Sequence, residues 1–263
     1  MRLMVALFIG FGFVGLWCGC ETPSYCDQYP YDSQCQPQSQ TKFQPQPYKP
    51  PPSGDPGKSS CDQSVSSTPV ELSIPYQPQE CTNLCWAGSI AMIARYFGRP
   101  VQECQLASEK IRLSTGYTYN CCNASVCYDP NCNVPAHVQE VATLFSTSLG
   151  IYGTMLSRPL SEVELQIELS NQRPVMVFYQ GNQSGHYAVI VGFTPGSPAY
   201  YHVNDPWPYF GSLQIPYQSI RLGPNGENWF MTYTRLSLNS DPCAGKLSQY
   251  PTSGRIFCLG VSL

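Results

Sequence analysis

Residues 79–97 carry the sequence QECTNLCWAGSIAMIARYF, and the rest of the chain is interpreted outward from it. After Cys85, apolar residues recur at the spacing of one broad helical face. Gly98 and Pro100 supply a stop signal, and Thr82 or Asn83 is expected to cap the start. The sequence therefore predicts a helix over 85–97 with a cysteine at its N-terminus. The apolar face consists of Trp86, Ile90, Ile93, Ala94 and Phe97.

Cys85 is the candidate nucleophile of this stretch. Backbone N–H groups and the helix dipole at a helix N-terminus favour an anion, so a thiolate is stabilised there. In a chain with 14 cysteines, half of a disulfide or a small buried apolar residue is the simpler interpretation. The Gln-Cys-Trp-Ala context favours a nucleophile instead, and a nucleophile needs a base as partner.

His186 is the expected base. It directly precedes an apolar run at 187–193, which is typical of a buried strand, and a ring at the mouth of a strand faces a cleft. Asp205 follows the next predicted strand, at 199–204, so two adjacent strands would bring it beside His186. There it would hold the tautomer of the ring and stabilise the imidazolium. Asn204 is the alternative to Asp205.

Gln79 is the candidate oxyanion donor. It lies six residues before Cys85, and its side-chain amide can donate a hydrogen bond to a developing negative charge. Gln77 is the alternative. Trp207 is expected to pack and to shield the His186–Asp205 pair.

These residues together resemble the papain-like cysteine peptidases. In that family an oxyanion glutamine lies six residues before a Cys-Trp-Ala helix start, which is similar to Gln79 and Cys85-Trp86-Ala87 here. The stretch 185–192 (GHYAVIVG) looks like the family's histidine strand. Asp205-Pro206-Trp207 is similar to its Asn-Ser-Trp element, with Asp in place of Asn. The resemblance covers about residues 72–236. The 101 residues from Cys85 to His186 are fewer than the roughly 130–150 of papain. This shortness resembles the compact bacterial branch, which includes bacteriocin leader-processing and effector-type peptidases.

The fold class follows from the order of the predicted elements. Helices come first and strands later, which indicates an α+β protein. The resemblance implies the papain-like arrangement, in which N-terminal helices, with the catalytic cysteine at a helix N-terminus, pack on an antiparallel sheet. Further helices are predicted at 101–113, 136–144 and 161–171, and strands at 174–179, 187–193, 199–204 and 229–236.

The first 20 residues are typical of an export signal. Arg2 precedes an apolar run at 3–17, LMVALFIGFGFVGLW, which suits a signal peptide better than a membrane span of about 20 residues. The run ends at Cys18-Gly19-Cys20, which resembles a bacterial lipobox with Cys20 acylated. We expect a signal peptide at 1–20 and a membrane tether through lipidated Cys20, at the outer surface or in the periplasm. Plain secretion and an uncleaved anchor are the alternatives.

The rest of the chain divides into three predicted parts. A Pro/Gln-rich linker at 21–70 cannot bury enough apolar surface to fold. The papain-like peptidase domain spans 71–240 and contains a Cys-rich insert at 114–133. A C-terminal tail at 241–263 holds Cys243 and Cys258, a candidate disulfide. Many cysteines favour disulfides in an exported chain, but the sequence leaves their connectivity open.

Composition excludes other classes of function. Only 12% of the residues are charged and the net charge is −3, which argues against a nucleic-acid-binding protein.

A zinc site formed by His137, Cys127 and Cys132 is less favoured than disulfides, because the spacing of these residues is not that of a common zinc motif. We expect no cofactor and no metal, His202 as a structural residue, and a monomer.

The sequence thus predicts an exported cysteine peptidase that hydrolyses peptide bonds of a peptide or protein substrate. The triad is Cys85, His186 and Asp205, and Gln79 assists the oxyanion. Two alternatives stay open: the same triad catalysing amide acyl transfer, and a non-catalytic, disulfide-rich surface binding module.

Overall fold

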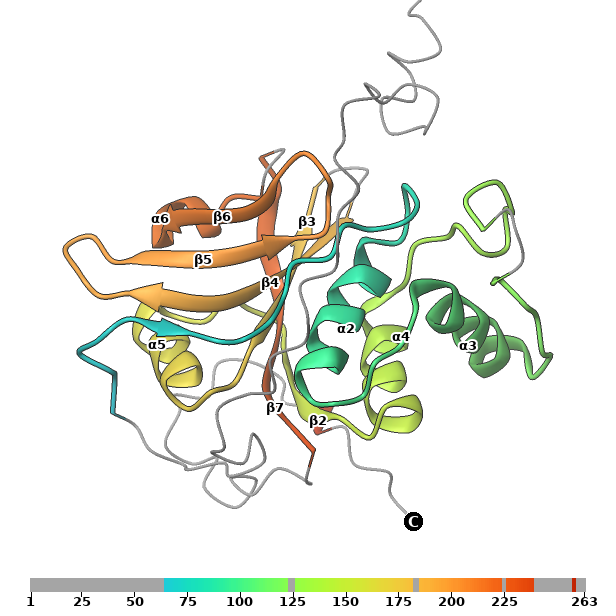
Figure 1. Cartoon of the computed structure of the whole chain (residues 1–263), viewed down its shortest axis with the longest axis horizontal. Coiled ribbons are helices and arrows are strands. Elements are labelled where there is room, and N and C mark those ends of the chain that lie inside the picture. Colours follow the sequence, from blue (N-terminus) through green and yellow to red (C-terminus); the bar gives the residue numbers. More distant parts are fainter. Residues whose placement is uncertain (1–63, 123–125, 182–184, 224–225, 239–256, 259–263) are drawn as a thin grey trace, which may run out of the picture. The chain divides into compact units, whose positions relative to one another are not determined.

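The structure, a computed structural model, describes residues 64–122, 126–181, 185–223, 226–238 and 257–258 (Figure 1). The chain divides into two compact units, 1–43 and 44–263, and all described residues belong to the second. The predicted signal peptide, most of the linker and nearly all of the C-terminal tail lie outside the described residues. Among those described, no helix is long and apolar enough to cross a membrane.

Helices and strands follow in the predicted order, with short additional strands. The helical elements are α2 (Cys85–Tyr96), α3 (Glu103–Thr115), α4 (Val138–Thr143), the π-helical turn η1 (Leu144–Ser148), α5 (Glu162–Ser170) and α6 (Tyr217–Ile220). The strands are β1 (Val70–Glu71), β2 (Tyr152–Leu156), β3 (Val175–Gln180), β4 (Gly185–Thr194), β5 (Tyr200–Asp205), β6 (Gly211–Pro216), β7 (Asn228–Ser237) and β8 (Phe257–Cys258).

The strands form one antiparallel sheet in the order β6-β5-β4-β3-β7-β2-β8, with β1 paired to β4. β4 therefore lies between β3 and β5. The expected pairing of the His186 strand with the Asp205 strand is present.

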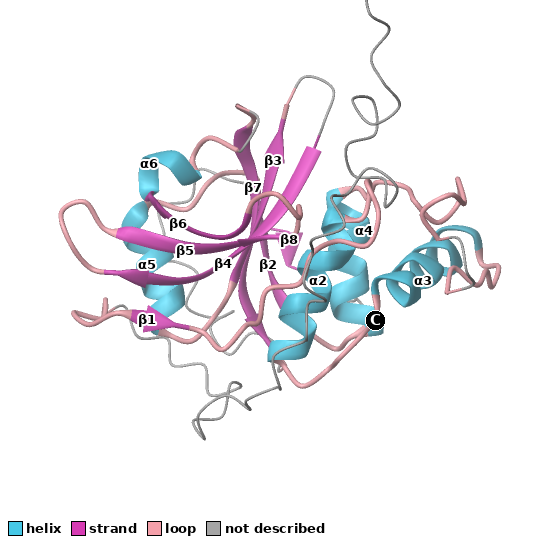
Figure 2. Ribbon diagram, turned by 45° about the horizontal axis from the view of Figure 1, so that its top comes forward, coloured by secondary structure: helices cyan, strands magenta, loops and turns pink. Residues whose placement is uncertain are grey.

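Helices lie on both sides of the sheet. α2, α3 and α4 gather on one side and α5 and α6 lie at the other (Figures 1 and 2). α2 packs against β4 and α3, and its Trp86, Ile90 and Ile93 are completely buried. Burial of one such side chain contributes roughly 1.5–3 kcal/mol, so the predicted apolar face anchors α2 to the sheet.

Local signals define most helix ends, but not the start of α2. Ser161 and Glu164 form a capping box at α5, and Gly116 ends α3 with a φ of 77°. The prediction that Thr82 or Asn83 caps α2 is wrong, because Leu84 is its N-cap residue and no side chain caps it. Asn83 and Thr82 are instead hydrogen-bonded to Asn133.

The Cys-rich insert is held by three disulfides. They join Cys81 to Cys127, Cys104 to Cys122 and Cys121 to Cys132. The first connects the insert to the chain just before α2, and the second connects it to α3. The insert is therefore cross-linked to α3 and to the segment that leads into the nucleophile.

A buried ion pair links α5 to β7. Arg173 donates to both carboxylate oxygens of Glu168, at 2.9 and 2.7 Å, and the backbone N–H of Arg235 donates to the same carboxylate at 2.9 Å. Arg173 and Glu168 are 5% and 2% exposed. A pair buried to this extent requires both partners, because either charge alone is strongly destabilising.

We expect Arg173→Met to lower the free energy of unfolding by roughly 3–5 kcal/mol, because it leaves the Glu168 carboxylate buried without its cation. Chemical denaturation followed by circular dichroism measures the change. Arg112→Met, which removes an exposed ion pair to Glu109, is the control and leaves the unfolding midpoint in place. A wild-type midpoint in Arg173→Met would show that the buried Glu168 carboxylate does not need its cation.

Candidate active site

Cys85 is the first residue of α2 and is 8% exposed. Among the cysteines whose side chains the structure describes, it is the free one, since the others form disulfides. Its interpretation as half of a disulfide is thereby excluded. The thiol lies at the positive end of the helix dipole, where a thiolate is stabilised.

The loop before Cys85 is fixed by the insert. Cys81 forms its disulfide with Cys127, and the backbone N–H of Leu84 donates to the Cys81 carbonyl at 3.1 Å. The indole N–H of Trp86 donates to the Val134 carbonyl at 3.0 Å. The insert and Val134, the residue directly after it, thus hold the two sides of Cys85, which restricts how far the nucleophile can move.

His186 and Asp205 meet across the neighbouring strands β4 and β5. The distance from His186 Nε2 to Asp205 Oδ1 is 2.8 Å, and the two residues are 4% and 2% exposed. The backbone N–H of Trp207 donates to the same carboxylate oxygen at 2.8 Å. Asp205 is therefore held from two directions, and it fixes the orientation of the ring.

Asn204, the alternative third residue, is engaged elsewhere. Its Nδ2 donates to the Ile74 carbonyl at 2.9 Å, and its Oδ1 accepts from the Ser212 hydroxyl at 2.7 Å. The structure brings Asp205, and not Asn204, to His186.

Aromatic rings enclose His186. The Trp207 ring centroid lies 5.3 Å from that of His186, and the Tyr179 ring is stacked 12° from parallel at 6.5 Å. Trp207 has the predicted shielding position. Tyr179 was not predicted, although it is paired with His186 in the β3–β4 register. These rings keep water away from the His186–Asp205 hydrogen bond, which strengthens it.

The surroundings of His186 favour its protonated form. Burial alone would lower the pKa of His186, but hydrogen bonds to Asp205 and to Cys85, together with the charges of both groups, raise it from 6.5 to about 10. The hydrogen-bonded ring contributes stability that is complete below pH 6.5 and is lost as the pH rises through about 10. At neutral pH the ring is therefore an imidazolium, held between the Asp205 carboxylate and the Cys85 sulfur.

Gln79 lies beside this group but uses its amide locally. Its backbone N–H donates to the Pro206 carbonyl at 2.7 Å, which attaches it to the residue after Asp205. Its Nε2 donates to the carbonyls of Cys81 and Thr82 at 2.7 and 3.0 Å. Gln77, the alternative, points away: it is bonded to Glu103 and Arg95.

The other histidines lie outside this group. His202 of β5 is hydrogen-bonded to Glu71, Thr194 and Gln214, as a structural residue would be. His137 is the N-cap residue of α4. Within the described part of the chain, no cluster of three metal-ligating side chains occurs.

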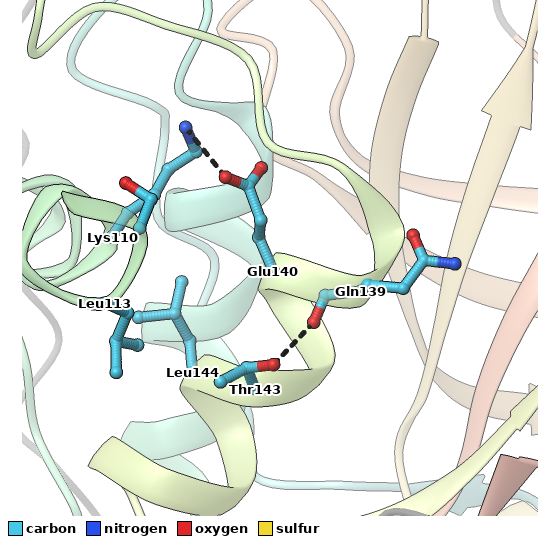
Figure 3. Close-up of a pocket in the computed structure, with 7 residues that line it drawn as sticks. Lys110, Leu113, Gln139, Glu140, Thr143 and Leu144 are labelled. Atoms are coloured by element: carbon cyan, nitrogen blue, oxygen red, sulfur yellow. Dashed lines mark hydrogen bonds and ion pairs between the residues drawn. The ribbon is translucent and has the colours of Figure 1, made fainter.

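A separate pocket of about 170 Å³ lies between α3 and α4 (Figure 3). Lys110 and Glu140 face each other across it at 3.3 Å, and Thr143 donates to the Gln139 carbonyl. None of its lining residues belongs to the Cys85–His186–Asp205 group.

Comparison with known proteins gives the family of the chain. The model of the Peptidase_C39 like family matches residues 71–222, which is more than half of the chain. The chain belongs to the Peptidase_C39 like family. Membership confirms the predicted papain-like α+β fold and the predicted enzyme class, a cysteine peptidase. The match covers nearly the same residues as the resemblance noted in the sequence.

Three solved structures are similar to this C39-like peptidase. A double glycine motif protease from an AMS/PCAT transporter, in complex with a leader peptide, is 17% identical, covering 64% of this chain and 99% of its own, with a TM-score of 0.37. The peptidase domain of Streptococcus ComA, a bi-functional ABC transporter, is 13% identical, covering 62% of this chain and 96% of its own, with a TM-score of 0.39. A C39-like peptidase from Bacillus anthracis is 16% identical, covering 64% of this chain and 98% of its own, with a TM-score of 0.43. No curated protein matches the chain significantly.

Titration of His186 tests the electrostatics of the site. We expect its ring, followed by NMR, to stay protonated well above pH 7. Asp205→Asn keeps an acceptor oxygen but removes the negative charge beside the ring, and so lowers the pKa of His186 by on the order of 1–3 units.

Glu71→Gln is the matched control, since its carboxylate is bonded to His202 rather than to His186. It leaves the titration of His186 unchanged. Equal titration of His186 in the wild type and in Asp205→Asn would contradict the assignment of Asp205 as its partner.

Proposed function

We propose that this C39-like peptidase hydrolyses peptide bonds through an acyl-enzyme formed on Cys85. One arrangement supports the proposal: a buried histidine ring is hydrogen-bonded both to Asp205 and to a free cysteine at a helix N-terminus. A nucleophile, a proton carrier and an orienting carboxylate in contact are the components of a cysteine peptidase triad.

The proposed reaction begins from an ion pair between the Cys85 thiolate and the His186 imidazolium. The thiolate attacks the scissile carbonyl carbon, a C–S bond forms, and the carbonyl oxygen becomes an oxyanion. His186 then donates its proton to the departing amine, and the C–N bond breaks. In the second half, neutral His186 takes a proton from water and the hydroxide attacks the thioester. The C–S bond breaks, the carboxylic acid leaves, and the thiolate–imidazolium pair is restored.

Oxyanion stabilisation is assigned to the backbone N–H of Cys85 and to the side-chain amide of Gln79. The Gln79 amide nitrogen now donates to the Cys81 and Thr82 carbonyls. The proposal requires that substrate binding exchanges one of these bonds for the oxyanion. Removal of one such donor typically costs about 10²–10³-fold in rate.

We expect a brief, substoichiometric treatment with an epoxide-type cysteine-peptidase probe to label Cys85 alone, as measured by mass spectrometry. His186→Ala loses the labelling because the thiolate loses its partner. On a randomised quenched-fluorescence peptide library, Cys85→Ala lowers turnover by about 10³-fold or more.

Ser89→Ala is a matched control on the same helix. Ser89 is completely buried, and its hydroxyl has no hydrogen-bond partner among the described residues, so this variant keeps its activity. Unlabelled Cys85 would favour the non-catalytic binding module. Labelled Cys85 whose acyl group passes to an added amine, with no hydrolysis product, would favour acyl transfer.

We further propose that the enzyme is exported and tethered to a membrane through lipidated Cys20. The apolar run at 3–17 and the Cys18-Gly19-Cys20 motif support this. The three disulfides around α2 and α3 support it independently, because disulfides persist in oxidising compartments.

Mass spectrometry of the mature protein tests the tether. We expect chain cleavage before Cys20, a lipid mass increment on that residue, and recovery in the membrane fraction. Cys20→Ser loses the increment and the membrane association. A wild-type protein that is cleaved there but soluble and without an increment would overturn the tether while leaving export in place.

A further inference from the structure

Glu103 is a buried carboxyl group that the proposed mechanism does not use. It is the first residue of α3 and is completely buried. Its Oε2 accepts from the backbone N–H of Glu80 at 2.9 Å, and its Oε1 accepts from the Gln77 amide at 3.3 Å. Neither donor carries a charge, so no cation at these two contacts offsets the burial of the carboxyl group.

The two donors flank Gln79. Residues 77–80, here called the oxyanion segment, are therefore held by Glu103 at both ends. The middle of the segment is held by the opposite wall of the site, where Gln79 N–H donates to the Pro206 carbonyl at 2.7 Å. Pro206 directly follows Asp205. The oxyanion segment is thus clamped between α3 and the triad end of β5.

The catalytic helix takes part in the same contacts. Gly88 lies one turn after Cys85, and a Cβ placed there would lie 3.3 Å from Glu103 Oε1, 3.1 Å from Pro206 Cβ and 3.6 Å from Gln79 Cα. Only the lack of a side chain at 88 lets Glu103, the oxyanion segment and Pro206 approach α2 this closely. Arg95, in the last turn of α2, donates to Gln77 Oε1 at 2.9 Å and extends the network.

Filling space does not account for a carboxyl group at this place. Burial raises the pKa of Glu103 to about 8, and the charge of Glu80 acts in the same direction, while the bonds from Glu80 N–H and Gln77 oppose it. Because the folded protein holds the Glu103 proton more tightly than the unfolded chain, the neutral carboxyl group stabilises the fold at low pH. This contribution to the free energy of unfolding is complete below pH 4.5 and is lost as the pH rises through about 8. An apolar side chain would fill the space without that loss, but it could not accept from both ends of the segment.

We propose that Glu103 is a positioning residue that fixes the oxyanion segment, and with it Gln79, against the start of the catalytic helix. The inference rests on the proposed function, because it assigns Glu103 to the oxyanion half of that mechanism. Glu103 acts through Gln79 and not on Cys85 or His186.

The test compares two reactions of the full-length protein. Hydrolysis of the randomised peptide library uses the oxyanion site, whereas alkylation of Cys85 by iodoacetamide uses only the thiolate. Glu103→Leu lowers kcat on the order of tenfold to a hundredfold, the scale of a misplaced catalytic group. KM and the alkylation rate stay at wild-type values. Glu103→Gln keeps one acceptor oxygen, so its kcat lies between the two.

A double-mutant cycle with Gln79→Ala isolates the positioning role. Once Gln79 is truncated, Glu103→Leu has no further effect on kcat, because the group that it positions is gone. Glu168→Gln is the matched control: it neutralises another buried carboxylate, lowers stability, and combines additively with Gln79→Ala. Thermal unfolding of each variant measures the folded fraction.

The outcomes separate the two proposals. If the wild type is active but the effects of Glu103→Leu and Gln79→Ala on kcat add up in the double variant, this inference alone is overturned. A loss of Cys85 alkylation in a folded Glu103→Leu would also overturn it, since the damage would then reach the thiolate. A wild type that neither hydrolyses the library nor alkylates rapidly at Cys85 would overturn both.

Discussion

The hydrogen bond between His186 and Asp205 is the constraint on which the site depends. It crosses between two neighbouring strands, so its 2.8 Å length is set by the β4–β5 register. It fixes which ring nitrogen faces Asp205 and leaves the other for Cys85. Burial lowers the pKa of His186, but the hydrogen bonds to Asp205 and Cys85 and the charges of both groups outweigh it, so the ring is a cation at neutral pH. The sheet, its order and its covering helices serve to hold this contact.

The Cys-rich insert restrains Cys85 on the helical side of the site, as the β4–β5 register restrains His186 and Asp205 on the sheet. A short loop before a helix is normally a mobile part of a domain, and no side chain caps α2. Here the disulfide at Cys81, the paired amides of Asn83 and Asn133, and the bond from Trp86 to Val134 restrain that loop. Cross-links from a surface insert thus replace the local capping interaction that the helix lacks.

Strong, local patterns made much of this predictable. The apolar spacing after Cys85 gave α2, and the long apolar runs gave β3, β4, β5 and β7, which bring His186 beside Asp205. β2 and β6 were missed because YGTML contains a glycine and GSLQIP alternates weakly at a sheet edge. The burial of Glu103 was invisible because an acidic residue in a first helical turn is ordinarily solvated. The disulfide partners and the backbone bond from Gln79 to Pro206 depend on the approach of distant segments, which one sequence does not contain.

The nucleophile and its base come from different layers of the domain. Cys85 is carried by α2, whereas His186 and Asp205 are carried by the sheet. In the described part of the chain, no covalent or main-chain bond joins Cys85 directly to His186. Their contact depends on side-chain packing between α2 and β4. A slight rotation of the helix against the strand would alter the sulfur-to-ring geometry while every helical and sheet hydrogen bond stayed intact. The reactivity of Cys85 is therefore more sensitive to the packing between α2 and β4 than the content of secondary structure is.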